Sequence, residues 1–197
     1  MVDKIALQFA PVTKELWPDF EKLFGPKGAY CGCWCVALRL PYRIRGNMSA
    51  EDRKAFIRTR IEAGPPPGIL GYCEGSPVAW VQVGPRYDVP QFNSPRTCSR
   101  PLEELEAEDA SVWAVSCFFL ASPLRGKGLS HRILAAAIDH ARKGGAHYLD
   151  ACPIDHSKQP KSVALYIGST AIFDAAGFDT VARRKDGRPL MRLDLRQ

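Results

Sequence analysis

Residues 111–145 constrain the fold more than any other part of this chain. Residues 111–120 are apolar and rich in β-branched and aromatic side chains, which is typical of a buried strand. Apolar residues then recur at helical spacing over 129–141, and two cations and a Gly-Gly pair follow. Pro123 closes the strand, and a short glycine-containing turn leads into the helix. The sequence therefore predicts a strand–turn–helix unit here.

The turn itself, R-G-K-G-L-S over 125–130, suits a bound anion. The first amides of a helix have no partners within the helix, and the helix dipole is positive at that end. Gly126 and Gly128 allow the backbone to approach a ligand closely, while Arg125 and Lys127 add positive charge. Together these features indicate a phosphate or pyrophosphate site.

Two common phosphate-binding motifs are excluded by single residues. A P-loop requires glycine where Ala121 stands, and a dinucleotide fingerprint requires a third glycine where His131 stands. The remaining pattern, R-x-x-G-x-[G/A] with Ser130 in the last place, resembles the acyl-CoA-binding signature of the GNAT superfamily of N-acyltransferases. The segment A-I-F-D-A-A-G-F at 171–178 resembles the short helix and Gly-Phe pair near the end of those domains.

The resemblance extends over nearly the whole chain. It is closest to a bacterial GNAT subgroup with a C-W-C motif (here 33–35), a V-W-x-V-x-C-F strand (112–118) and a closing motif that runs from a Tyr to Gly-Phe (166–178). It implies an α/β protein with the GNAT fold, in one domain over 1–197. The expected sheet is mixed and mostly antiparallel, with about six or seven strands flanked by roughly four helices.

The resemblance also implies a reaction: transfer of an acetyl group from acetyl-CoA to a primary amine, by direct attack in a ternary complex. Pantetheine would pair with backbone at Phe118, Phe119 and Leu120, and a strand amide near Phe119 or Leu120 would stabilise the oxyanion. The pyrophosphate would sit near Arg125 on five backbone amides, those of Gly126, Lys127, Gly128, Leu129 and Ser130. Alternatives are a non-catalytic acyl-CoA-binding module, another acyl donor or an oxygen acceptor.

Two residues are candidates for proton transfer. Many GNAT enzymes have a tyrosine, proposed to protonate the leaving thiolate, where this chain has Phe173. Tyr166, seven residues earlier, is not the matched acid, but it could still reach the cofactor and is a candidate catalytic residue. Asp150, in the strand beside the pantetheine gap, is a candidate general base. The alternative for Asp150 is a structural carboxylate at the end of a strand.

The resemblance implies that residues 25–47 and 85–109 form the acceptor pocket, and Trp34, Cys35 and Trp113 are candidate substrate contacts. Cys31, Cys33 and Cys35 alternate, so an extended backbone would point all three to one side. Their C-x-C-x-C spacing lacks the usual C-x-x-C of zinc sites, so we expect buried small side chains and no metal. Cys117 is expected to pack in the core rather than act as a nucleophile.

The remaining elements follow from local patterns. Strands are expected over 5–10, 69–73, 78–83, 147–152, 178–184 and 190–195. Helices are expected over 17–24, over 50–63 behind a capping box of Ser49 and Asp52, and over 170–176. Two loops are expected, an ordered one over 85–109 with at most a helical turn and a polar one over 153–161.

The net charge of +6 favours anionic ligands, but the basic residues are spread along the chain, so nucleic acid is not an expected partner. No signal sequence and no apolar run of about 20 residues is present, which predicts a cytoplasmic protein without a membrane partner. Seven cysteines, an odd number, then suggest free thiols. The resemblance leaves a homodimer open.

Overall fold

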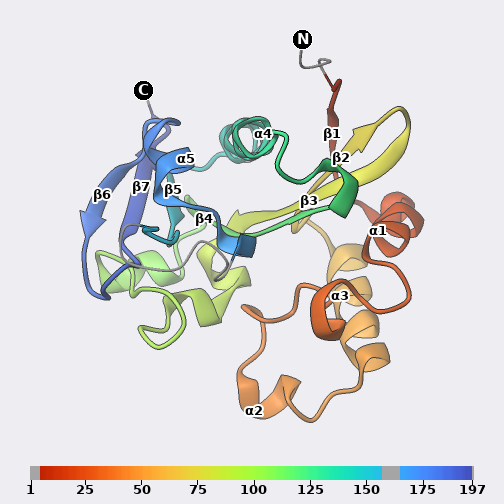
Figure 1. Ribbon diagram of the computed structural model, residues 1–197. Helices are drawn as coiled ribbons and strands as arrows, with labels where there is room; N and C mark the ends of the chain where they lie inside the picture. Colours follow the sequence, from red (N-terminus) through yellow and green to blue (C-terminus); the bar gives the residue numbers. More distant parts are fainter. Residues whose placement is uncertain (1–4, 157–164, 197) are drawn as a thin grey trace.

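A single seven-stranded sheet forms the centre of the structure, a computed structural model that describes residues 5–156 and 165–196 (Figure 1). The strand order is β1-β2-β3-β4-β5-β7-β6, and every neighbouring pair is antiparallel except β4–β5. The expected mixed, mostly antiparallel sheet is therefore confirmed. The strands are β1 (Gln8–Pro11), β2 (Gly68–Cys73), β3 (Ser76–Pro85), β4 (Val112–Leu120), β5 (Tyr148–Ala151), β6 (Asp179–Ala182) and β7 (Leu190–Asp194).

Helices cover both faces of this sheet (Figure 1). They are α1 (Trp17–Phe24), α2 (Tyr42–Arg45), α3 (Ala50–Ala63), α4 (Ser130–Lys143) and α5 (Thr170–Asp174). One apolar core joins α4 and α5 to the sheet, and a second core joins α1, α3 and the loop before α2 to β2 and β3. The two cores lie on opposite sides of β4, because successive residues of a strand point to opposite faces.

Local sequence signals account for the ends of the two N-terminal helices. Pro18 lies in the first turn of α1, where its missing N–H costs nothing, and Gly25 ends that helix at a φ of 66°. The predicted capping box of α3 is present: Ser49 accepts from the Asp52 amide, and the Asp52 side chain accepts from the Ser49 amide. These signals set the ends of α1 and α3, and both helices pack against the sheet next to the expected acceptor pocket.

Two segments differ from the sequence expectations. The stretch 85–109 contains three short 3₁₀ helices, at Arg86–Asp88, Pro90–Asn93 and Glu104–Ala107, and α2 was not expected at all. Residues 157–161 of the polar loop expected over 153–161 lie outside the described residues. Within the described ranges no helix is long and apolar enough to cross a bilayer.

The cysteine-containing loop is also not extended, so the expected alternation of its three thiols was wrong. Four residues other than glycine have positive φ within seven positions: Ala29 (62°), Cys31 (53°), Trp34 (43°) and Cys35 (58°). Such values are uncommon outside glycine and strained for a bulky side chain. The physical reason is tertiary packing, since Trp34 is buried and stacks on Phe24 at a ring separation of 5.7 Å.

Candidate active site

The sheet opens between its two parallel strands. Val112–Val115 of β4 pair with Tyr148–Ala151 of β5, and beyond Val115 β4 has no paired residue in β5. A β-bulge lies at this point, because Gln82 of β3 pairs with Cys117 and Val83 pairs with Val115, which leaves Ser116 as the extra residue. The second half of β4 therefore keeps β3 on one side and borders a gap on the other.

Backbone groups of β4 point into this gap. The Ala121 amide donates to the Val78 carbonyl at 2.8 Å, so by the alternation of antiparallel pairs Phe119 also bonds to β3. The N–H and C=O groups of Phe118 and Leu120 face the other way, toward the gap. Of the three residues predicted to pair with pantetheine, these two are oriented for it and Phe119 is not.

The predicted anion site stands at the mouth of the gap. A 3₁₀ turn (Ser122–Leu124) follows β4, and the exposed stretch 125–128 leads to the buried Leu129 and the start of α4. Gly126 and Gly128 have φ of 75° and 69°, and a Cβ on either would meet nothing within 4 Å. Leu129 provides no side-chain cap, so the first amides of α4 are left for a ligand. The geometry fits a phosphate group.

Arg125 is held differently from the sequence expectation. Its Nε donates to the carbonyl of Leu120 at 2.8 Å, and its guanidinium lies 5.9 Å from the centre of the Phe119 ring. The side chain therefore folds back over the end of β4 and buttresses the turn. Lys127 stays exposed at the same turn.

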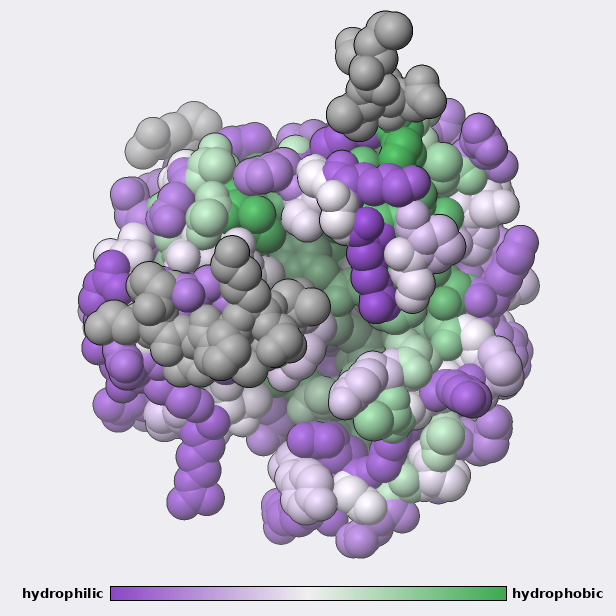
Figure 2. All heavy atoms as spheres, in the orientation of Figure 1, coloured by the Kyte–Doolittle hydropathy of each residue, from purple (hydrophilic) through white to green (hydrophobic). Residues whose placement is uncertain are grey.

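Figure 2 shows a hollow with an apolar floor in the middle of the molecule, between α4 above and α2 below. The short 3₁₀ helix at Leu165–Ile167 packs against β4 here and carries Tyr166. Tyr166 is 53% exposed, and partial burial raises the pKa of its hydroxyl despite the opposing charge of Arg188. With its pKa raised, the hydroxyl of Tyr166 stays protonated at neutral pH.

Phe173 has no such role in the structure. Its ring is fully buried and makes edge-on contacts with Phe118 and Phe178, at centroid separations of 6.1 and 5.0 Å. The position where many relatives of the fold carry tyrosine is thus part of the core beneath the gap.

Asp150 is buried in an ion-pair network, which corrects its expected role as a general base. Its side chain has no exposed surface. One oxygen accepts from Arg192 Nε at 2.7 Å, and the other accepts from Arg192 Nη2 at 3.0 Å and from Arg86 Nη1. Both oxygens accept hydrogen bonds from arginine side chains, and the carboxylate has no surface that a substrate could contact. The structural alternative is the one that the geometry favours.

The network extends to residues that the sequence did not single out. Arg86 also donates to Asn93 Oδ1 (2.8 Å) and to the Ser99 carbonyl (2.9 Å), and Arg192 is bidentate to Glu106 (2.7 and 2.8 Å). Burial alone would raise the pKa of Glu106, but the hydrogen bonds and charge of Arg192 outweigh it and lower the pKa. The network thereby fixes the 85–109 loop to β5 and β7.

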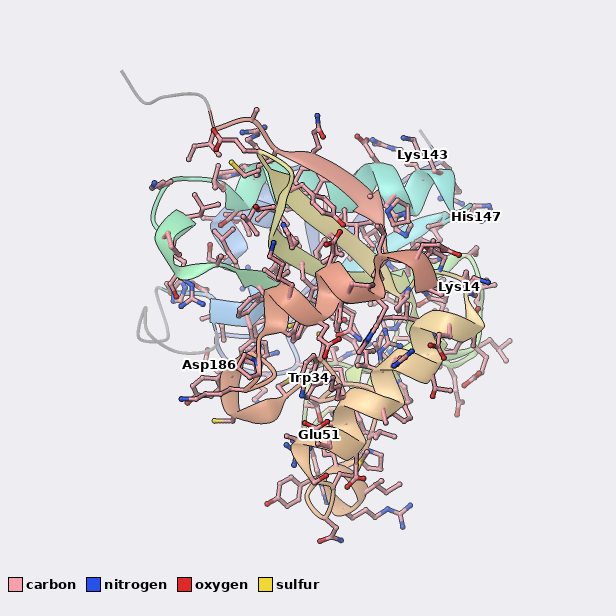
Figure 3. The ribbon with its side chains drawn as sticks, turned by 90° about the vertical axis from the view of Figure 1, so that its right-hand side faces the viewer. Lys14, Trp34, Glu51, Lys143, His147 and Asp186 are labelled. Carbon is pink, nitrogen blue, oxygen red and sulfur yellow. The ribbon has the colours of Figure 1, made fainter. Side chains whose placement is uncertain are left out.

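Two of the three predicted acceptor contacts are core residues. Trp34 is 1% exposed and lies between α1 and α3, with Lys54 5.6 Å from its ring (Figure 3). Trp113 donates its indole N–H to the Ala110 carbonyl at 2.9 Å and packs edge-on against His140 of α4, away from the bulge. Neither side chain lines the hollow, because both rings pack in the apolar core.

The third predicted contact, Cys35, lies next to the bulge. Its sulfur accepts a hydrogen bond from Trp80 Nε1 at 3.1 Å, and the side-chain amide of Gln82 is also 3.1 Å away. Turned toward Arg39, the Gln82 oxygen accepts from Nη2 and Nε at 2.9 Å each. Arg39 in turn pairs with Asp88, with Nη1 and Oδ2 2.5 Å apart. A polar chain thus runs from the bulge to the loop after β3.

No group of three or more histidine, cysteine or acidic side chains is placed to hold a metal ion within residues 5–156 and 165–196. The cysteines among these residues are all free thiols.

Comparisons with known proteins support the fold. The family model described as the acetyltransferase (GNAT) family matches residues 12–168. An acetyltransferase of the GNAT family from Listeria monocytogenes is similar with a TM-score of 0.60 and 12% identity, covering 98% of each chain. An N-acetyltransferase from Staphylococcus aureus is similar with a TM-score of 0.53 and 13% identity, covering 97% of this chain and 99% of that one.

A third similar structure contains the ligand expected here. It is a proposed acetyltransferase of Salmonella typhimurium with its cofactor acetyl-CoA, with a TM-score of 0.52, 16% identity and coverage of 96% of this chain and 94% of that one. At these identities the likeness concerns the fold. None of the curated proteins compared matches the sequence.

Proposed function

Because the chain belongs to the acetyltransferase (GNAT) family, we propose that it transfers an acetyl group from acetyl-CoA to a primary amine, by direct attack with both substrates bound. One observation carries this proposal: the parting of β4 from β5 leads directly into the glycine turn before α4. A gap bordered by free backbone groups, with an anion site at its mouth, matches a long ligand that has amides at one end and a pyrophosphate at the other.

Each part of the donor site has a distinct task. Bound acetyl-CoA supplies an acyl group activated as a thioester. The backbone groups of Phe118 and the amide of Leu120 would align the pantetheine arm along β4. The amides of 126–130 would hold the pyrophosphate, where the helix dipole adds favourable charge. A fixed strand amide facing the gap would stabilise the negative charge that develops on the carbonyl oxygen.

Proton transfer rests on Tyr166 and on the substrate itself. Tyr166 keeps its proton at neutral pH and would donate it toward the departing thiolate. A thiol has a pKa near 8.5, so it is a fair leaving group even with weak assistance. With Asp150 engaged by two arginines, the amine would enter as the free base, and the site's main contribution is orientation.

Calorimetric titration with acetyl-CoA, with NADH as the control, tests the donor site. We expect binding with a dissociation constant in the micromolar range for acetyl-CoA and no heat with NADH. Absence of binding to acetyl-CoA would contradict the assignment of the 125–130 turn and remove the main support for the enzyme.

A non-catalytic acyl-CoA-binding module is the second candidate. It is favoured by the buried Phe173 and by the ion-paired Asp150, which remove two groups that a catalyst would use. A screen of primary amines with detection of released thiol separates the two. A catalyst releases CoA with some acceptor, whereas a binding module releases none with any.

We also propose that the protein works in a reducing compartment such as the cytoplasm. The support is its thiol content: seven cysteines, all of them unpaired.

A further inference from the structure

Two cysteines from distant parts of the chain meet beside the bulge. Cys35 comes from the strained loop before α2, and Cys117 is the β4 residue directly opposite Gln82 of β3. The Cys35 sulfur touches Trp80 and Gln82, which share one face of β3, and Cys117 packs against the same apolar cluster. Both cysteines therefore lie beside Gln82 and belong to the same apolar cluster on one face of the sheet.

The surroundings of Cys35 favour a negatively charged sulfur. Trp80 donates to it, and when the Gln82 oxygen faces Arg39 the Gln82 NH₂ group faces the sulfur. The neighbouring thiol of Cys117, followed by the hydrogen bond from Trp80 and the charge of Arg39, outweighs burial and lowers the pKa of Cys35. The Cys35 thiol and burial raise the pKa of Cys117. The donors around Cys35 thus favour it over Cys117 as the nucleophilic sulfur.

Access is available from the Cys117 side. Cys35 is 3% exposed, whereas Cys117 is only partly buried and belongs to the stretch of β4 that borders the gap. Of the two sulfurs, Cys117 is therefore the one on the more accessible side. The second close pair of thiols, Cys98 and Cys152, is buried on both sides, at 5% and 3% exposure.

We propose that Cys35 and Cys117 form a reversible disulfide when a small hydroperoxide enters the gap, and that this bond switches off acetyl transfer. The regulatory half of this proposal rests on the proposed function, whereas the modification itself does not. The strained backbone of the 29–35 loop brings a buried cysteine to the one half-buried thiol of β4, and neither the packing of Trp34 nor the donor site requires a sulfur there.

The chemistry balances with hydrogen peroxide as the only oxidant. The Cys35 thiolate attacks one peroxide oxygen, the O–O bond breaks, and the departing hydroxide takes up a proton to form water. The sulfur of Cys117 then attacks the resulting sulfenic acid, its proton leaves with the hydroxyl group as a second water, and an S–S bond forms. Two thiols and one peroxide give one disulfide and two waters, so both sulfurs are oxidised and both oxygens are reduced.

The bond would act on the acceptor side of the site. It replaces the hydrogen bonds of the Cys35 sulfur and ties the loop before α2 to β4 one residue beyond the bulge. The donor site at 125–130 lies beyond the far end of β4, so the disulfide would not change it. Oxidation should therefore lower transfer while leaving acetyl-CoA affinity unchanged.

Peptide mapping tests the modification without any assay of activity. The reduced full-length protein is treated with hydrogen peroxide, its remaining thiols are alkylated, and the digest is analysed by mass spectrometry. We expect a cross-linked peptide pair containing Cys35 and Cys117, lighter by two hydrogens, that disappears after treatment with dithiothreitol. A disulfide between Cys98 and Cys152 instead, or alkylated Cys35 and Cys117, would overturn the proposal.

Activity measurements test the switch. Oxidised protein should transfer acetyl groups about tenfold or more slowly than reduced protein, bind acetyl-CoA equally well, and recover with dithiothreitol. Cys73→Ser, at the far end of β2, is the matched control and should keep both activity and sensitivity to peroxide. Cys117→Ser should abolish the inhibition that dithiothreitol reverses. A disulfide that forms without loss of rate refutes the switch, while absence of transfer in the reduced protein refutes only the proposed function.

Discussion

Burial decides the role of the carboxylate at position 150. The strand position and the residue type suit a general base, but the side chain is enclosed and its oxygens face Arg86 and Arg192. The sequence shows neither contact, since those arginines lie 64 and 42 residues away. A role assigned from residue type alone therefore fails where distant charges converge.

Replacing Asp150 by asparagine should act on stability rather than on catalysis. Removing one partner of a buried ion pair leaves uncompensated charge, so we expect the free energy of unfolding to fall by about 3–5 kcal/mol. Urea denaturation measures this, with Asp139→Asn, whose side chain is 67% exposed, as the control. If stability held and the rate instead lost its pH dependence, Asp150 would be the base after all.

Replacing Tyr166 by phenylalanine should act on catalysis. The hydroxyl keeps its proton because burial raises its pKa, so its loss removes a proton donor and should lower kcat by about a hundredfold. Steady-state kinetics and calorimetry should show that change with an unaltered affinity for acetyl-CoA. Tyr42→Phe, on the exposed face of α2, is the control. An unchanged kcat would mean that the thiolate leaves unassisted.

At the scale of elements, the gap and the glycine turn are continuous with one another. The strand–turn–helix unit was predictable because its signals are local: an apolar run, two glycines and a periodic helix. The direction of the β4 backbone groups was not, since it depends on the bulge at Ser116 and on the pairing with β3. For this reason the family resemblance implies the same role for Phe118, Phe119 and Leu120, whereas the structure separates Phe119 from the other two.

The turn can be tested with a pair of glycine variants. Gly128 and Gly75 both have positive φ, at 69° and 73°, and a Cβ on either meets nothing within 4 Å. Alanine at each site should therefore cost similar stability, roughly 1 kcal/mol. Only Gly128→Ala should weaken acetyl-CoA binding, by about tenfold, because its methyl group occupies the space of the pyrophosphate. Equal affinities in the two variants by calorimetry would contradict the site.

Segments shaped by distant contacts escaped prediction. The 85–109 loop is organised around Arg86, which bonds Asn93, Ser99 and Asp150 at once. The 29–35 loop adopts left-handed backbone because Trp34 must reach the core between α1 and α3. Neither loop has a periodic sequence pattern, so its backbone conformation could not be predicted from the sequence.

At the scale of the whole molecule, half-buried ion pairs connect the N-terminal helices to the sheet. Asp88, after β3, accepts two hydrogen bonds from Arg60 of α3, at 2.7 and 2.9 Å, and also pairs with Arg39. Burial raises the pKa of Asp88, but Arg60 and Arg39 outweigh it and the pKa is lowered. The mixed, mostly antiparallel sheet was predictable from the family resemblance, whereas this charge network was not.

The lowered pKa of Asp88 determines how the stability of the protein changes with pH. A carboxyl group whose pKa is lower in the folded state adds stability above its unfolded value, near 3.8, and this contribution is lost as the pH falls through the folded value. Asp88→Asn should thus cost about 3 kcal/mol at pH 7 and progressively less below pH 4. Urea denaturation at a series of pH values measures the difference. A cost that does not change with pH would rule out this linkage.

The parted strands have a consequence for the protein before any substrate arrives. Half of β4 is an edge inside the sheet, with backbone groups on one side that have no neighbouring strand. A pantetheine arm, itself built of amides, would fill the place of the missing strand and complete the hydrogen-bonded ladder. The thermal tolerance and cellular lifetime of the protein would then follow the supply of coenzyme, because a ligand that binds only the folded chain protects it by mass action.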